Sequence, residues 1–276
     1  MCTPPTRAES DHPDSILLYP SPQPGWCSEF FDLPMPKLGD LPKDPELLNT
    51  YSHFYHSWLD YASLNPSRWR YDCKDFVRLR KFLTLPGRSP LKSLKIFTHG
   101  VKVGNPGYFN DSRDFDCKSD SIEDNILHIH DLMNDVKTGK VAGPFPLQPG
   151  QNFVKVFVRK DKFYKVPLFF ANRFCTYKTK RLQTKGRRVT DLTGNGLNSF
   201  ANQDQRSVYN LPNFHFLMAL LNKKKYLFDF DYQAAYRNVP YSCDSWGLVS
   251  FCYNNKAFVD LSLTFGFCEA AYIMQN

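Results

Sequence analysis

The chain has 276 residues, of which 42% are hydrophobic and 16% aromatic, enough to bury a substantial core, which excludes a wholly disordered polypeptide. The formal net charge is +8, and no run approaches the roughly 18 apolar residues of a membrane span, so we expect a soluble, intracellular protein with no membrane contact. The eight cysteines include no Cys-x-x-Cys pair and are expected to be reduced thiols, not zinc ligands.

The positive charge is concentrated after residue 50. Residues 1–50 hold eight acidic and three basic side chains, which leaves a net charge of +13 on residues 51–276. A basic surface attracts polyanions, because each neutralised phosphate releases counterions. Nucleic acid is therefore the expected partner, with an ordinary lysine-rich soluble surface as the alternative.

The N-terminal region is rich in proline, with half of the twenty prolines of the chain in residues 1–50. Proline lacks the backbone N–H donor and fixes φ, which opposes both helix and sheet. We expect residues 1–43 to form a disordered tail.

Two helices are predicted in a lead-in region that spans residues 44–142. Asp44 can cap a helix over about 45–63, where apolar residues recur at helical spacing. Ser121 has the spacing of a capping box for a second helix over 121–138, which also carries one apolar stripe.

From residue 143 onward the pattern is typical of short strands, with one helix among them. Together with the two preceding helices, these elements predict an α+β fold. They are a hairpin of 153–158 and 163–170, a helix over 211–221, a strand over 226–230, a hairpin of 247–253 and 257–263, and a helix that begins near Gly266.

Between Arg173 and Arg188 the chain has seven basic residues and no acidic one. Phe174 and Tyr177 interleave with these charges, an arrangement typical of contacts with phosphates and bases. A solvated loop is the alternative interpretation. We expect nucleic acid to be contacted here by Lys178, Lys180, Arg181, Lys185 and Arg188.

Asp231 follows the expected strand over 226–230. A carboxylate at the end of a buried strand is costly unless a cation or hydrogen bonds stabilise it. Mg²⁺ bound by such a carboxylate can hold phosphate oxygens, and the ring of Tyr236, five residues later, can lie under an incoming sugar. From these residues alone, an ordinary surface aspartate at a strand end is the alternative.

The segment over 226–240 resembles motif A of reverse transcriptases, an Asp followed by four residues, an aromatic residue and then Val-Pro. The resemblance implies that Asp231 is the catalytic, metal-binding aspartate. It also implies that the backbone carbonyl of Tyr232 completes the coordination of the metal, and that Tyr236 screens the sugar 2′-hydroxyl.

Two further segments resemble the same family. Residues 258–267 are similar to the strand and Leu-Pro-Phe-Gly of motif B, which implies nucleotide contacts by Phe265 and Gly266. Residues 186–198 resemble the fingers strand Trp-Arg-x-x-x-Asp-Leu followed by Leu-Asn, where Arg187 takes the triphosphate-binding position.

Residues 139–145 are similar to the Gly-Arg-x-x-Gly-Pro-Phe of DIRS-like retrotransposon polymerases, which also carry Phe before the motif B glycine. The resemblance covers about residues 120–276. It implies that residues 143–276 form the fingers and an incomplete palm of a right-hand polymerase, truncated after motif B.

The sequence departs from the family at three places. Thr264 stands where Pro is usual, and Glu269 where a small residue is common. The stretch between Phe170 and Gly186 is longer than the usual fingers turn. This length leaves the triphosphate-binding lysine open among Lys178, Lys180 and Lys185.

The second catalytic segment of the family, aromatic-x-Asp-Asp, has no counterpart here, because the chain contains no Asp-Asp pair. Two-metal catalysis needs carboxylates from both segments, so we expect these residues alone to be inactive. The resemblance implies a fragment of an RNA-directed DNA polymerase of a mobile element, with Mg²⁺ as cofactor once the palm is completed. RNA template, DNA primer and deoxynucleoside triphosphates are the implied partners.

Two other functions are open. The chain could be a non-catalytic basic nucleic-acid-binding module that no longer has an active site. It could also be an unrelated α+β domain that binds single-stranded RNA through Phe174 and Tyr177.

Overall fold

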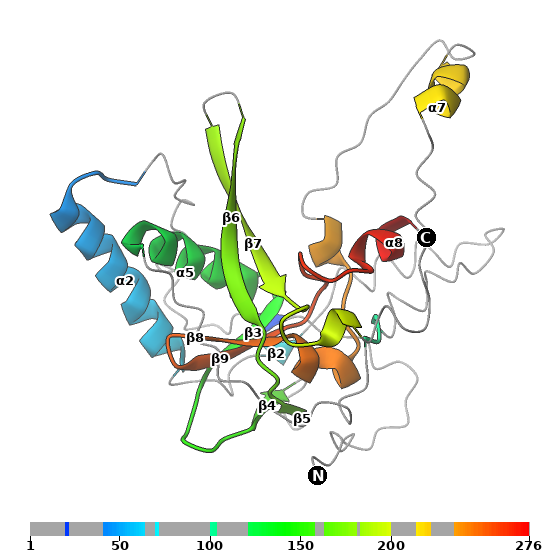
Figure 1. Cartoon of the computed structure of the whole chain (residues 1–276). Helices are drawn as coiled ribbons and strands as arrows, with labels where there is room; N and C mark the ends of the chain where they lie inside the picture. Colours follow the sequence, from blue (N-terminus) through cyan, green and yellow to red (C-terminus); the bar gives the residue numbers. More distant parts are fainter. Residues whose placement is uncertain are drawn as a thin grey trace.

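The computed structural model describes residues 20–21, 41–63, 70–71, 100–103, 121–157, 163–180, 183–199, 214–221 and 235–275. Helices and small antiparallel sheets make up these residues (Figure 1), which confirms the predicted α+β class. Among the helices described, none has the length and apolar character needed to cross a membrane.

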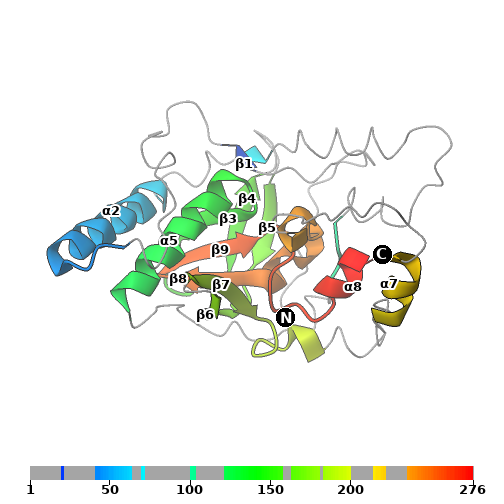
Figure 2. The ribbon, with the colours of Figure 1, turned by 90° about the horizontal axis from the view of Figure 1, so that it is seen from above.

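Two helices lie side by side in both views, α2 (Pro45–Ser63) and α5 (Ile122–Lys137) (Figures 1 and 2). Each begins at its predicted cap. The Asp44 carboxylate accepts a hydrogen bond of 3.0 Å from the backbone N–H two residues later, and the Ser121 hydroxyl accepts one of 3.2 Å from the N–H three residues later. Both predicted helices are confirmed.

The central sheet contains β3 (Val141–Pro146), β9 (Lys256–Asp260) and β8 (Ser250–Tyr253), in that spatial order and antiparallel. Both α2 and α5 pack against β3. Asn254 and Asn255 form the β8–β9 turn with φ of 50° and 56°, since asparagine tolerates a left-handed backbone better than most residues.

The predicted hairpin of 247–253 and 257–263 is shorter in the structure. The start of its first strand belongs instead to the 3₁₀ helix η5 (Cys243–Val249), and its second strand ends at Asp260. Beyond Asp260 the backbone pairs with residues 239–241 through hydrogen bonds of 2.9 and 2.8 Å. This change of partner brings two segments of the candidate site together.

Two more hairpins follow the helices. The first is formed by β4 (Phe153–Phe157) and β5 (Phe163–Pro167), close to the prediction. The second is formed by β6 (Asn172–Lys180) and β7 (Gln183–Asp191), and it projects from the body of the fold (Figure 1). The stretch between Phe170 and Gly186, which is longer than the usual fingers turn, is therefore mostly strand and contains β6 and the start of β7.

Shorter elements complete the described structure. They are β1 (Pro20–Ser21) paired with β2 (Arg70–Tyr71), α7 (Phe214–Leu221), η4 (Ala235–Asn238) and α8 (Ala270–Gln275). The helix α7 lies within the predicted 211–221, and α8 starts later than expected. Of the tail predicted to be disordered, only residues 20–21 and 41–43 are described, and the predicted strand 226–230 lies outside the described residues.

One buried core joins the helices, the central sheet and the turns that follow it. Its largest fully buried side chains come from all three: Trp58 of α2, Ile129 of α5, Phe258 of β9, Tyr241 just before η5 and Trp246 within it. The predicted lead-in region and the region after residue 143 therefore share a core, which fixes α5 relative to the strands and turns.

Candidate functional site

Tyr236 and Phe265, which are distant in sequence, make an edge-to-face aromatic contact. Their ring centroids are 5.2 Å apart, and the interplanar angle is 68°. Tyr236 lies in η4 and is half-buried, whereas Phe265 lies in the loop before α8 and is 37% exposed. Two residues predicted to contact a nucleotide thus form one partly open aromatic surface.

Gly266 brings this loop against the end of β7. Its φ is 114°, and a Cβ built on it would stand 2.0 Å from the backbone oxygen of Thr190. The backbone N–H of Thr190 donates a hydrogen bond to the carbonyl of Phe265 at 2.8 Å. Only glycine permits both this backbone conformation and this approach.

Asn198 fixes the same loop from a second direction. Its side-chain nitrogen donates to the carbonyl of Gly266 at 2.8 Å and to the hydroxyl of Thr193 at 2.9 Å. Its side-chain oxygen accepts a hydrogen bond of 3.0 Å from the backbone N–H of Cys268. The predicted fingers segment and the predicted motif B loop are therefore joined by side-chain and backbone hydrogen bonds.

Thr264, at the position where the resemblance to reverse transcriptases leads one to expect proline, is buried beside Tyr241. The Tyr241 hydroxyl lies 3.3 Å from the Thr264 hydroxyl and accepts a hydrogen bond of 3.3 Å from the Thr264 backbone N–H. Burial raises the pKa of Tyr241 above its ordinary range, so the phenol is neutral. A proline at 264 would lack the N–H that makes this contact.

The other predicted site residues are described only in part. Arg187 lies on β7, three residues before Thr190, and its backbone pairs with Thr176 of β6. Lys178 and Lys185 are paired in the backbone register of the same hairpin. The structure does not describe their side chains or those of Lys180, Arg181 and Arg187. The predicted metal ligands, Asp231 and Tyr232, lie outside the described residues.

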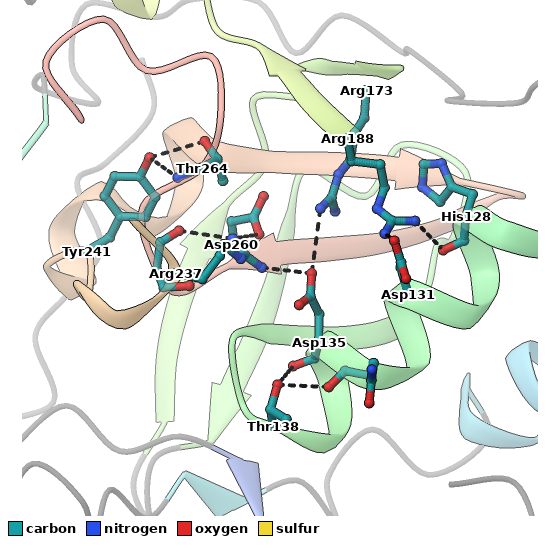
Figure 3. A network of polar contacts seen from close by, with 12 residues as sticks. His128, Asp131, Asp135, Thr138, Arg173, Arg188, Arg237, Tyr241, Asp260 and Thr264 are labelled. Atoms are coloured by element: carbon teal, nitrogen blue, oxygen red, sulfur yellow. Dashed lines mark hydrogen bonds and ion pairs between the residues drawn. The ribbon is translucent and has the colours of Figure 1, made fainter. Parts of the chain in front are cut away.

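Arg188 does not point outward from the hairpin. Its guanidinium contacts the carboxylate of Asp131 on α5 and donates to the backbone carbonyls of Leu127 and His128 at 3.0 and 3.3 Å (Figure 3). These contacts engage both terminal nitrogens of the guanidinium. Arg188 therefore holds β7 to α5 in this structure, and its expected contact with nucleic acid stays a prediction.

A buried arginine next to Tyr236 forms the centre of a second set of ion pairs. Nη1 of Arg237 donates to Oδ1 of Asp260 at 2.7 Å, and its Nη2 donates to Oδ2 of Asp135 at 2.9 Å (Figure 3). Burial acts to lower the pKa of Arg237, but the two carboxylates raise it above its usual value. Arg237, Asp260 and Asp135 were not singled out from the sequence.

The described residues contain no group of three or more His, Cys, Asp or Glu side chains that could hold a metal ion. The prediction that Asp231 binds Mg²⁺ concerns a residue outside them. No protein-family model matches the chain, and neither the curated proteins nor the solved structures contain a match.

Proposed function

We propose that this chain forms the fingers and the first part of the palm of an RNA-directed DNA polymerase of a mobile element, similar to the DIRS-like group. One observation carries the proposal. Tyr236, the loop of Phe265 and Gly266, and the end of β7 beside Thr190 lie together, although each comes from a separate motif. The meeting of these three segments at one place supports the proposal.

The shared location suits an incoming deoxynucleotide. The ring of Tyr236 would lie under the sugar, and the edge-to-face contact with Phe265 supports that ring. Gly266 has no Cβ and so allows close approach to the backbone. Arg187, on the strand that reaches this point, would bind the triphosphate with its planar guanidinium.

The metal ligands in this proposal are the carboxylate of Asp231 and the backbone carbonyl of Tyr232. Mg²⁺ held there would neutralise charge on the phosphate oxygens. Because both residues lie within five positions of Tyr236, they would be close in sequence to the ring that selects the sugar.

A non-catalytic nucleic-acid-binding module is the second candidate, favoured by the β6–β7 hairpin. The hairpin projects from the fold and its backbone carries Lys178, Lys180, Lys185 and Arg187. Phe174, on β6, is 43% exposed and could stack on a base. This function would require neither Asp231 nor selection of a sugar.

Nucleotide selection separates the two candidates. Equilibrium binding of labelled dATP and ATP to the full chain, in Mg²⁺ and with primer–template present, should show a preference for dATP. Tyr236→Ala should remove that preference by opening space for the 2′-hydroxyl, whereas Tyr51→Ala, at an exposed position on α2, should retain it. Equal binding of both nucleotides by the unsubstituted chain would favour the non-catalytic module.

A further inference from the structure

Asp135 of α5 is shared by two arginines from different parts of the fold. Its Oδ2 accepts a hydrogen bond from Arg237 at 2.9 Å and lies 3.7 Å from Nη2 of Arg173 (Figure 3). Arg237 belongs to η4, the turn that carries Tyr236, and Arg173 is at the base of β6. One carboxylate thus contacts both the candidate sugar-selecting turn and the hairpin.

Arg237 is held at both ends of its guanidinium. Besides its bond to Asp135, it donates to Asp260 at 2.7 Å and to the carbonyl of Ser262 at 3.2 Å. Its side chain is buried, so these charge-assisted bonds are strong and their planar geometry leaves few alternative positions. Because Tyr236 precedes Arg237 in the same 3₁₀ turn, the position of Arg237 constrains that of Tyr236.

The base of β6 is constrained in a similar way. The Arg173 side chain is 5% exposed, and its guanidinium carbon lies 4.3 Å from the ring centre of Phe251 in β8. The Asp135 carboxylate therefore lies between two buried cations, Arg173 and Arg237. Removal of the Asp135 charge would leave less negative charge beside the two buried guanidinium groups. At least one of the two arginine side chains would then have to move.

We propose that Asp135 is a positioning residue that couples the base of the β6–β7 hairpin to the turn that carries Tyr236. The proposal rests on the proposed function, in which the hairpin binds the triphosphate and Tyr236 selects the sugar. A shift of the hairpin toward a bound nucleotide is then transmitted through Arg173, Asp135 and Arg237 to the residue that selects the sugar.

Asp131 provides a matched control on α5, one helical turn before Asp135. Its carboxylate contacts Arg188 of β7, so it also anchors the hairpin. The two side chains are similarly exposed, 23% for Asp131 and 21% for Asp135. The ion pairs of the described residues connect only Asp135, not Asp131, to η4.

Amide hydrogen exchange of the full chain tests the coupling directly. Asp135→Asn should speed exchange by about tenfold or more both at the base of β6, over 172–176, and over 236–241. Asp131→Asn should speed exchange in the hairpin alone. Protection of 236–241 that is unchanged in Asp135→Asn, or equally reduced in Asp131→Asn, would overturn the proposal.

Arg237→Lys keeps the proposal testable if Asp135→Asn does not fold. One ammonium retains the charge but cannot reproduce the bonds of the guanidinium to both Asp135 and Asp260. This variant should loosen 236–241 and leave the hairpin protected by Arg188. An unchanged exchange rate over 236–241 would contradict a positioning role for the Asp135–Arg237 pair.

Nucleotide selection then distinguishes the coupling from the function on which it rests. In the binding experiment with labelled dATP and ATP, Asp135→Asn should reduce the preference for dATP by about tenfold, and Asp131→Asn should retain it. If exchange shows the coupling but the unsubstituted chain does not prefer dATP, the proposed function fails and the coupling stands. If the unsubstituted chain prefers dATP and Asp135→Asn retains the full preference, the positioning role is overturned.

Discussion

Gly266 lies so close to Thr190 that a Cβ at position 266 would stand 2.0 Å from the Thr190 carbonyl oxygen. The φ of Gly266, 114°, is one that residues with side chains rarely adopt. The backbone N–H of Thr190 is bonded to the carbonyl of Phe265. A backbone hydrogen bond and a close backbone approach therefore attach the loop before α8 to the end of β7.

Gly266→Ala should lower the free energy of unfolding by roughly 3 kcal/mol or more, because strain in φ adds to a clash with backbone that cannot move aside easily. Urea denaturation measures this loss. Gly150→Ala is the matched control: its φ is 74°, but no atom lies within 4 Å of the added Cβ. It should cost only about 1 kcal/mol. Similar losses in the two variants would contradict the close approach of Gly266 to Thr190.

Asp260→Asn should lower the free energy of unfolding by about 3–5 kcal/mol, because the buried guanidinium of Arg237 loses one of its two carboxylate partners. The Asp260 side chain is 0% exposed. Asp60, which is 68% exposed and lies 3.0 Å from Lys256, gives the comparison. Asp60→Asn should cost less than about 1 kcal/mol in the same denaturation experiment. A loss for Asp260→Asn no greater than that of Asp60→Asn would mean that the buried pair contributes little.

The folded chain should lose stability at mildly acidic pH, because His130 is buried in its neutral form. Its Nδ1 lies 2.8 Å from the Tyr55 hydroxyl, and burial, assisted by Arg188, lowers its pKa from 6.5 to about 4. As the pH falls below 6.5, the unfolded chain therefore takes up a proton before the folded chain does. The stabilisation by neutral His130 is complete above pH 6.5 and is lost as pH falls toward 4, by up to about 3 kcal/mol.

Denaturation curves between pH 7.5 and 4.5 test this prediction. His130→Gln should flatten the dependence of the unfolding free energy on pH. Part of the slope should persist, because burial also lowers the pKa of His128. His53→Gln, at an exposed position on α2, should leave the slope unchanged. A slope that is the same in all three proteins would place the pH dependence in other groups.

The outer part of the β6–β7 hairpin should bind nucleic acid with an affinity that falls steeply with salt. Replacement of Lys178, Lys180, Arg181 and Lys185 by Gln should reduce the slope of log affinity against log salt by up to about 3, since each lost phosphate contact removes roughly 0.7–0.9. The control replaces Lys43, Lys102, Lys155 and Lys165, all exposed, and changes the net charge equally. Equal slopes in the two variants would show that overall charge, not the hairpin, determines binding.

Some of the structure could be predicted because short segments carry their own signal. The Ser121 cap predicts the start of α5, and Asn254-Asn255 predicts the turn between β8 and β9. Tyr236 and Phe265 could be singled out because the segments that contain them resemble two polymerase motifs in their usual order. In each case the informative residues lie within one element or one motif.

The ion pairs could not be predicted, because their partners are remote in sequence. Arg237 is 102 residues from Asp135 and 23 from Asp260. From the sequence alone, Arg237 and Asp135 are each expected to be ordinary charged residues on the surface. The one local signal is Asp260 itself, an acidic residue inside the apolar run of 257–263. A buried carboxylate in such a run requires a cation, but the sequence does not show which one.

The central claim, that Asp231 is the metal-binding carboxylate of a polymerase palm, is tested most directly by primer extension. Residues 1–276 alone should extend no primer, because the second carboxylate segment is absent from them. A chimaera that joins them to the remaining palm and thumb of a DIRS-like polymerase should extend an RNA-templated DNA primer in Mg²⁺. Asp231→Asn should abolish this extension, and Asp229→Asn should retain it. Extension that survives Asp231→Asn, or that is lost instead in Asp229→Asn, would contradict the assignment.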